Sequence, residues 1–392
     1  MRSRLLALVC GVIVLAGCGH PPAPSAAGPV VAGRGCPAGP VLFGLPAGSL
    51  AGIQFVSAAR GWAVGQDVIL ATADGGRRWT VQRRGPLNLT SVDFIGARDG
   101  WAVGTDTVLA TSDGGARWAA LPEPEPCLPI RSVHFISPDT GFAVAGGRDI
   151  ADVGPETAET GGVVLATSDG GRRWRVLPAP ADAQTVCFSG PQAGWLGAGG
   201  RLYRTTDGGL SWAQVTAGPR ASVGGYPAVM IVQCTGAGAA WALDVGMGAT
   251  MSKQPNVGYH AGPAGAAPIF AEQWFPHPGV RVAADSPGAY PGPFSAISPL
   301  VAVYIGFCPA CAGTATAPTA PWDLVTGSGA VLTPQGDIGG LTDPEAASFL
   351  SPQLGWVAGA SSYSGDGRFR QCILFTDDAG RTWQVQYASP SP

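Results

Sequence analysis

The stretch LATSDGGARW, residues 109–118, decides the fold, because close copies of it recur along the chain. The copies are LATADGGRRW at 70–79, LATSDGGRRW at 165–174, YRTTDGGLSW at 203–212 and LFTDDAGRTW at 374–383. An acidic, glycine-rich loop beside arginines fits either a repeated active or metal site or a repeated structural turn. The sequence around each copy helps to choose between these two interpretations.

The repeat is longer than this ten-residue box. In the second unit the phrase VDFIGARDGWAVG, residues 92–104, precedes the box, and related phrases precede the other boxes. Fainter copies stand at 232–246 and 295–306, before the last unit. A repeat of roughly 40 to 50 residues with four short strands is typical of a propeller blade. The sequence therefore predicts an all-β fold, a seven-bladed β-propeller of four-stranded antiparallel blades, spanning approximately 51–83, 90–121, 130–178, 184–216, 228–280, 293–335 and 345–388.

The residue types of the box suit a tight turn between the third and fourth strands of a blade. Glycine adopts positive φ at little steric cost, and an aspartate side chain accepts hydrogen bonds from nearby backbone amides. The tryptophan at the end of the box begins the fourth strand, where it can bury a large face between sheets. We therefore expect a structural role for the box residues Asp74, Trp79, Asp113, Trp118, Asp169, Trp174, Asp207, Trp212, Asp377 and Trp383.

The pattern S/T-x-D-x-G-x-x-W resembles the Asp-box, or BNR, repeat. This repeat occurs in sialidases, sortilin-type receptors, xyloglucan-cleaving hydrolases and photosystem II assembly and stability factors. The longer phrase, with GWAVG ahead of the box, is most similar to the last of these and to their bacterial relatives. The resemblance implies a propeller and no particular activity. The sixth unit departs from it, with Ser328 in place of the aspartate and Thr333 in place of the tryptophan.

The N-terminus predicts export and lipid anchoring. Arg2 and Arg4 precede the apolar segment LLALVCGVIVLAG, residues 5–17, which is short for a membrane span. The segment ends in LAGC, which resembles a bacterial lipobox with Cys18 as the lipidated residue; the alternative is an ordinary secretory signal cleaved nearby. We expect a signal peptide at 1–17, a flexible tether at 18–38 and the propeller at 39–392. This arrangement predicts an extracytoplasmic protein on the outer leaflet of the bacterial cytoplasmic membrane.

The cysteines then belong to an oxidising compartment, where disulfides are expected. CPAC at 308–311 lies in a loop-like segment, which favours a local disulfide between Cys308 and Cys311 over a redox motif or a zinc site. Cys187 and Cys234 fall on the first strands of adjacent predicted blades, one register position apart. A disulfide between them stays open, because their side chains could point in opposite directions.

Composition and motifs point away from catalysis. A net charge of −3 gives no basic footprint for nucleic acid. The F/Y-R-I-P phrase of sialidases is missing, since Phe369 and Arg370 are followed by Gln371. A xyloglucanase-like enzyme needs two carboxylates roughly 5 to 10 Å apart, but the box aspartates belong to different blades. We expect no cofactor and no metal.

Irregular length is confined to the connections between the second and third strands and between successive blades. Both kinds of connection emerge on one face, which the sequence therefore predicts as the binding face, although the same loops could merely cap the channel. Its candidate residues are Arg83, Arg84, Arg148, Tyr259, Tyr363, Arg368 and Arg370. The function predicted is a monomeric, lipid-anchored, non-catalytic scaffold that binds a protein or cell-envelope partner. The alternative is a glycan-directed enzyme or lectin.

Overall fold

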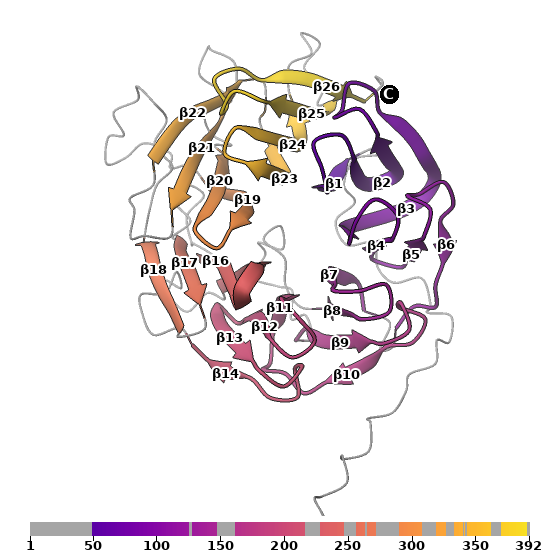
Figure 1. Ribbon diagram of the computed structural model, residues 1–392, viewed down its shortest axis with the longest axis vertical. Helices are drawn as coiled ribbons and strands as arrows, with labels where there is room; N and C mark the ends of the chain where they lie inside the picture. Colours follow the sequence, from indigo (N-terminus) through magenta and orange to yellow (C-terminus); the bar gives the residue numbers. More distant parts are fainter. Residues whose placement is uncertain are drawn as a thin grey trace, which may run out of the picture.

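The computed structural model describes residues 49–124, 128–146, 161–215, 228–246, 256–262, 265–271, 290–307, 319–326, 333–339, 341, 343–361 and 370–389. These residues form antiparallel sheets arranged as a ring around a central axis (Figure 1). Of the helices among them, none has the length and apolar character needed to cross a membrane.

The sheets follow one another in chain order. The first has six strands: β1 (Leu50–Phe55), β2 (Gly61–Thr72), β3 (Thr80–Phe94), β4 (Gly100–Gly104), β5 (Val108–Thr111) and β6 (Ala119–Ala120). The next two are β7 (Ile130–Phe135), β8 (Gly141–Ala145), β9 (Val163–Thr167) and β10 (Arg175–Leu177), and then β11 (Ala183–Phe188), β12 (Gly194–Ala198), β13 (Arg201–Thr205) and β14 (Ala213–Gln214).

The last three sheets have four strands each. They are β15 (Ala228–Thr235), β16 (Ala239–Gly246), β17 (Asn256–Gly262) and β18 (Gly265–Ala271); β19 (Tyr290–Ser298), β20 (Val301–Phe307), β21 (Thr319–Thr326) and β22 (Thr333–Gly339); and β23 (Asp343–Ser351), β24 (Leu354–Ser361), β25 (Arg370–Thr376) and β26 (Gln384–Ala388). A short 3-10 helix, η1 (Gly236–Gly238), joins β15 to β16. The first strand of each four-stranded sheet lies at the axis and the last at the rim (Figure 1).

The expectation of seven four-stranded blades is wrong. The described residues form five four-stranded blades, and one six-stranded sheet takes the place of the first two predicted blades. The reason lies in β3, which pairs with β2 through its first half and with β4 through its second half. The predicted boundary between residues 83 and 90 does not interrupt this strand, because Leu87 and Leu89 are buried there against Val64 and Ala102.

Stacked aromatic side chains join several of the sheet segments to the next. Phe94 stacks on Trp62 of the preceding unit, with ring centroids 3.5 Å apart, and meets Trp118 of its own box edge-on at 5.8 Å. Phe135 repeats this arrangement with Trp101 and Trp174. A Cβ atom on Gly100 would collide with the Phe94 ring, so the glycine ahead of Trp101 leaves room for this packing, as do Gly61, Gly194 and Gly355 in their own units.

The same contacts close the ring between the first sheet and the last blade. Phe55 in β1 stacks on Trp356 in β24 with centroids 3.5 Å apart, and both belong to one buried cluster. The Phe55 amide also donates to Ser348 Oγ at 2.9 Å, and the Leu50 amide donates to Gln371 Oε1 at 3.0 Å. Since β26 pairs only with β25 within the described part of the chain, side-chain packing closes the ring rather than a shared strand.

One side of the ring consists of short, fixed turns, and we call it the box face. Here a backbone amide of each box donates a hydrogen bond to a carbonyl in the turn between the first two strands of its own unit. The Gly75 amide donates to the Ala59 carbonyl at 2.9 Å, and the Gly114 amide donates to the Arg98 carbonyl at 2.9 Å. The connections between second and third strands emerge on the opposite side, which we call the loop face.

Candidate functional site

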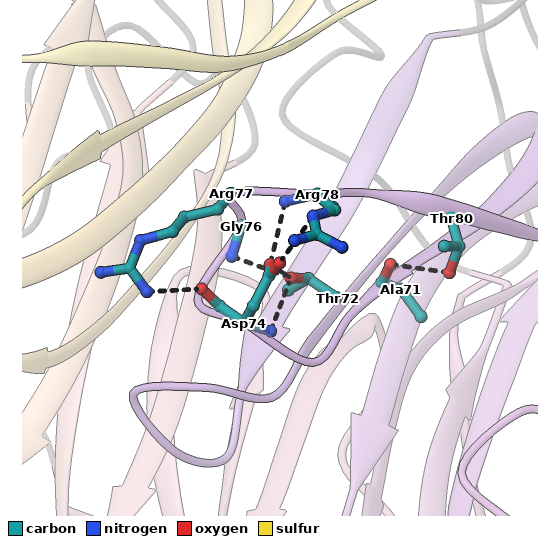
Figure 2. Close-up of polar contacts among 7 residues, drawn as sticks. All are labelled: Ala71, Thr72, Asp74, Gly76, Arg77, Arg78 and Thr80. Carbon is teal, nitrogen blue, oxygen red and sulfur yellow. Dashed lines mark hydrogen bonds and ion pairs between the residues drawn. The ribbon is translucent and has the colours of Figure 1, made fainter.

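The first box shows why these residue types recur (Figure 2). The Thr72 hydroxyl accepts the amide protons of Asp74 at 3.3 Å and Gly76 at 2.8 Å, and it donates to Asp74 Oδ1 at 3.0 Å. Asp74 Oδ1 also accepts the Arg78 amide proton at 2.9 Å. Threonine and aspartate thus satisfy backbone amides that a turn of this tightness leaves without a main-chain partner.

The other boxes repeat these bonds. They are made by Thr111 with Asp113, Thr167 with Asp169, Thr205 with Asp207 and Thr376 with Asp378. The expected assignment of Asp377 is therefore wrong, because Asp378 is the residue that accepts the Thr382 amide proton. The sequence held a signal for this, since in every other box the aspartate stands two residues after the threonine.

The carboxylates of Asp74, Asp113 and Asp207 have lowered pKa values, which favours their ionised form. The backbone amide of Arg78 lowers the pKa of Asp74, and the Arg117 amide lowers the pKa of Asp113 in the same way. Hydrogen bonds from the Ser211 side chain and backbone lower the pKa of Asp207 to about 2. These groups act as permanent hydrogen-bond acceptors and not as proton donors for acid catalysis.

The first three boxes each also receive a tryptophan from the unit before them in the ring. Trp62 Nε1 donates to the Gly114 carbonyl at 3.2 Å, and Trp101 Nε1 donates to the Gly170 carbonyl at 2.9 Å. Trp356 Nε1 reaches the Gly75 carbonyl at 3.3 Å across the closure of the ring. Each of these three boxes is therefore both a local turn and a point of contact that helps to set the spacing between neighbouring units.

The most deeply buried tryptophans are those of the second strands. Trp62, Trp195, Trp241 and Trp356 are all at most 1% exposed. Of the box tryptophans, Trp174 is buried, whereas Trp79, Trp118, Trp212 and Trp383 are only partly buried. The second-strand tryptophans thus contribute most to the packing between units, and the box tryptophans cover the outer edge of the same clusters.

Polar side chains on the innermost strands form a second set of links between neighbouring units. Gln54 Oε1 accepts the Phe94 amide proton at 2.6 Å, and Asp93 Oδ2 accepts the Phe135 amide proton at 2.6 Å. His134 Nε2 lies 2.7 Å from the Phe188 carbonyl. Farther round the ring, Gln233 Oε1 accepts the Ala296 amide proton and Ser295 Oγ accepts the Phe349 amide proton. Burial raises the pKa of Asp93, and the nearby His134 opposes this effect.

At one junction between units, a disulfide takes the place of the hydrogen bond that an innermost-strand side chain accepts from the next unit. Cys187 in β11 is bonded to Cys234 in β15, with the two Cα atoms 5.5 Å apart. Cys234 stands where the other units carry the phenylalanine that stacks on a tryptophan, so this junction has a covalent link where that stack is missing. Cys372 is a free, buried thiol whose pKa burial raises to about 12. Cys308, Cys311 and Cys18 lie outside the described residues.

The predicted binding-face residues do not form one surface. Tyr259 is wrong as a surface residue, because it pairs with Ala242 inside the sheet and is 2% exposed. Arg83 bonds the Trp118 carbonyl at 3.3 Å, and Arg84 is exposed on β3. Arg370 begins β25 and is partly buried. The remaining candidates, Arg148, Tyr363 and Arg368, lie outside the described residues.

A pocket of about 310 Å³ opens on the box face, between the first box and the second. Its walls include the side chains of Arg60, Trp62, Asp74, Arg78 and Gln82. The sequence did not indicate it, because its lining comes from two units that meet only in the ring. Within the described residues, no group of three or more His, Cys, Asp or Glu side chains is placed to hold a metal ion.

Comparison with known proteins shows which proteins this repeat resembles. Residues 45–177 match the family model described as photosynthesis system II assembly factor YCF48. The structure of YCF48 from Cyanidioschyzon merolae is similar over 86% of this chain and 98% of that one, at 15% identity and a TM-score of 0.54. A GH74 xyloglucanase from Xanthomonas campestris is similar over 87% of this chain and 54% of that one, at 14% identity and a TM-score of 0.55.

A structure of YCF48 bound to D1 peptide covers 87% of this chain and 82% of that one, at 16% identity and a TM-score of 0.40, which is too low to carry the peptide's position over. None of the curated proteins matches the chain. At these identities the solved structures show the fold alone, and the chain spans about half of the xyloglucanase. The expected resemblance is thus confirmed: this is an all-β propeller whose residues 45–177 match the family of the photosystem II assembly factor YCF48.

Proposed function

We propose that this chain is a non-catalytic scaffold that binds and helps to assemble a protein partner at the cell envelope. One observation carries the proposal: the repeated polar groups are used by the fold itself. The carboxylates of the boxes accept their own backbone amides, and Asp93 accepts the Phe135 amide proton of the next strand. The match of residues 45–177 to an assembly-factor family supports the same class of function.

The location is part of this proposal. The lipobox-like LAGC segment favours a lipid on Cys18 and attachment to the outer leaflet of the cytoplasmic membrane. The Cys187–Cys234 disulfide supports an oxidising compartment, because the reducing cytosol keeps such thiols unpaired. Residues 18–38 would then be the tether between membrane and propeller.

The loop face is the side on which we place the partner. The β8–β9 hairpin illustrates its construction: Ala145 and Val163 pair directly, so residues 146–162 form an insertion between two well-paired strands. Rigid strands that carry an insertion of this length are a usual arrangement for binding loops. Arg84, which is exposed within β3, is the predicted binding-face arginine that we include in this proposal.

The experiment uses the full chain in membranes, with crosslinking followed by purification. Deletion of residues 147–161 leaves Gly146 and Gly162 as a two-residue turn between β8 and β9, so the ring should fold unchanged. We expect the crosslinked partner to be lost in this variant and kept in the control Arg117→Gln, which alters an exposed side chain of the box face.

Two results would contradict the proposal. The first is an equal yield of crosslinked partner from the deletion variant and the intact chain. The second is cleavage of a fluorogenic glycoside by the purified chain, which would favour the glycan-directed alternative.

A further inference from the structure

The pocket on the box face has two arginine side chains at its opening. Arg60, from the turn between β1 and β2, is exposed, and its guanidinium has no partner among the described residues. Arg78, from the first box, has a side chain that is 89% exposed. Two guanidinium groups, each with five N–H donors in a planar fork, therefore stand at one opening.

The acidic group of the pocket only partly offsets this charge. Asp74 Oδ2 lies 3.7 Å from Arg78 Nε, beyond hydrogen-bond distance, and Asp74 Oδ1 is occupied by Thr72 and the Arg78 amide. Figure 2 shows the Arg77 side chain leaving the turn in a different direction, toward the Asp74 carbonyl. Two cations against one anion leave the pocket with a net charge of +1.

The floor of the pocket is fixed by hydrogen bonds. Gln82 Nε2 and Trp62 Nε1 both donate to the Gly114 carbonyl, at 2.8 and 3.2 Å. Gln82 Oε1 accepts the Trp118 indole proton at 3.1 Å. The Trp62 indole is 1% exposed, so it forms a rigid apolar base below the charged rim. The site is thus preformed and needs no rearrangement to receive a small group.

The other boxed units do not repeat this combination. Arg60 directly precedes the Gly-Trp pair at the start of β2. In the other boxed units the residue directly before the matching Gly-Trp or Gly-Phe pair is Asp99, Thr140, Ala193 or Leu354. The position of Gln82 is taken by Leu121, Leu177 and Val215 in the next three units. Gln386 of the last unit repeats it and accepts the Trp356 indole proton at 3.1 Å. The glutamine is thus a recurring part of the packing between units. An arginine at the Arg60 position occurs in the first boxed unit and in none of the other four, so the fold does not require it, which points to a ligand.

We propose that this pocket binds the carboxylate group of a ligand between Arg60 and Arg78. Planar guanidinium groups pair with carboxylates through two parallel hydrogen bonds, which gives both strength and orientation. A monoanion fits the net charge of +1, whereas the Asp74 carboxylate disfavours a dianion such as phosphate. The pocket opens on the box face, so this inference goes beyond the proposed function and does not depend on the loop face.

The test is calorimetric titration of the full chain with two acids and one neutral analogue. N-acetylglutamate α-amide represents an acidic peptide side chain, glucuronate represents a saccharide acid, and N-acetylglutamine α-amide lacks the charge. We expect at least one acid to bind and the neutral amide not to bind. The tighter of the two acids then identifies the source of the carboxylate.

Substitutions assign the binding to this pocket. Arg60→Gln and Arg78→Gln should each weaken acid binding about tenfold, since each removes charge-assisted hydrogen bonds. The control is Arg173→Gln, at the same box position as Arg78 but in another unit. Folding should survive, because Ser211 and Thr382 occupy that position in two other boxes.

Three results would overturn the inference. They are failure of both acids to bind at tens of millimolar concentration, inorganic phosphate binding as tightly as the acids, and equal affinity in the wild type, Arg60→Gln and Arg78→Gln. None of these results bears on partner binding at the loop face, so failure here and failure of the proposed function are distinguishable.

Discussion

The threonine of the box, rather than its aspartate, holds the buried part of the turn. Thr111 is 7% exposed, and its hydroxyl accepts the amide protons of Asp113 at 3.3 Å and Gly115 at 2.9 Å. The same hydroxyl donates to Asp113 Oδ1 at 2.9 Å. Thr111→Val keeps the shape of the side chain and removes all three hydrogen bonds, so it isolates their contribution to stability.

The expected loss follows from what is left without a partner. The Gly115 amide is buried, and an unsatisfied buried donor costs about 1–3 kcal/mol. The Asp113 amide is only partly buried, so water can replace its partner and the extra cost is small. We therefore expect Thr111→Val to lower the free energy of unfolding by about 2 kcal/mol, roughly a 30-fold change in the folding equilibrium.

Urea unfolding followed by tryptophan fluorescence measures this loss as a lower midpoint with an unchanged slope. With a slope of about 3 kcal/mol/M, the midpoint should fall by roughly 0.7 M. Hydrogen exchange at the Gly115 amide provides a local measurement and should accelerate in the variant. The control Thr111→Ser keeps the hydroxyl and should cost much less. Equal losses in the two variants, or a midpoint shift below about 0.2 M for the valine, would refute the reasoning.

Two other predictions concern stability. Because the folded pKa of Asp207 is about 2, below its ordinary 3.8, the stability that its carboxylate contributes is present above pH 3.8 and is lost as the pH falls toward 2. Urea midpoints of the wild type and Asp207→Asn should thus differ at pH 6 and converge as the pH approaches 2; a constant difference would contradict this. Replacing Cys187 and Cys234 together by serine should cost about 4 kcal/mol, because the disulfide closes a loop of 47 residues. Thermal unfolding without reductant checks this, and a loss below about 1 kcal/mol would count against a role of the bond in ring stability.

Much of the box could be predicted from the sequence, because its bonds join residues at most four positions apart. The aspartate, glycine and threonine types specify the turn locally, and the structure shows these bonds in each box. The one misplaced residue, Asp377 for Asp378, arose where two aspartates adjoin. The spacing from Thr376 resolves it without any tertiary information.

The candidate site was harder to predict than the fold. Tyr259 looks like an interface residue by type, but its burial depends on a sheet partner in β16. The carboxylate pocket combines Arg60 and Arg78 from one unit with Gly114 from the next. Nothing in the local pattern of either unit indicates that pocket, because its lining forms only when neighbouring units pack together.

By itself, the sequence determined the repeat, the propeller fold and the chemistry of the turns, since each depends on short-range periodicity and on bonds within a few residues. Only the tertiary structure decided how the strands divide into sheets and how the ring closes. β3 continues through a predicted boundary because Leu87 and Leu89 find buried partners, and Phe55 closes the ring on Trp356 from the far end of the chain. The tertiary structure also decided that Cys187 pairs with Cys234. These outcomes depend on packing between residues that are distant along the chain, and that packing exists only once the sheets have assembled.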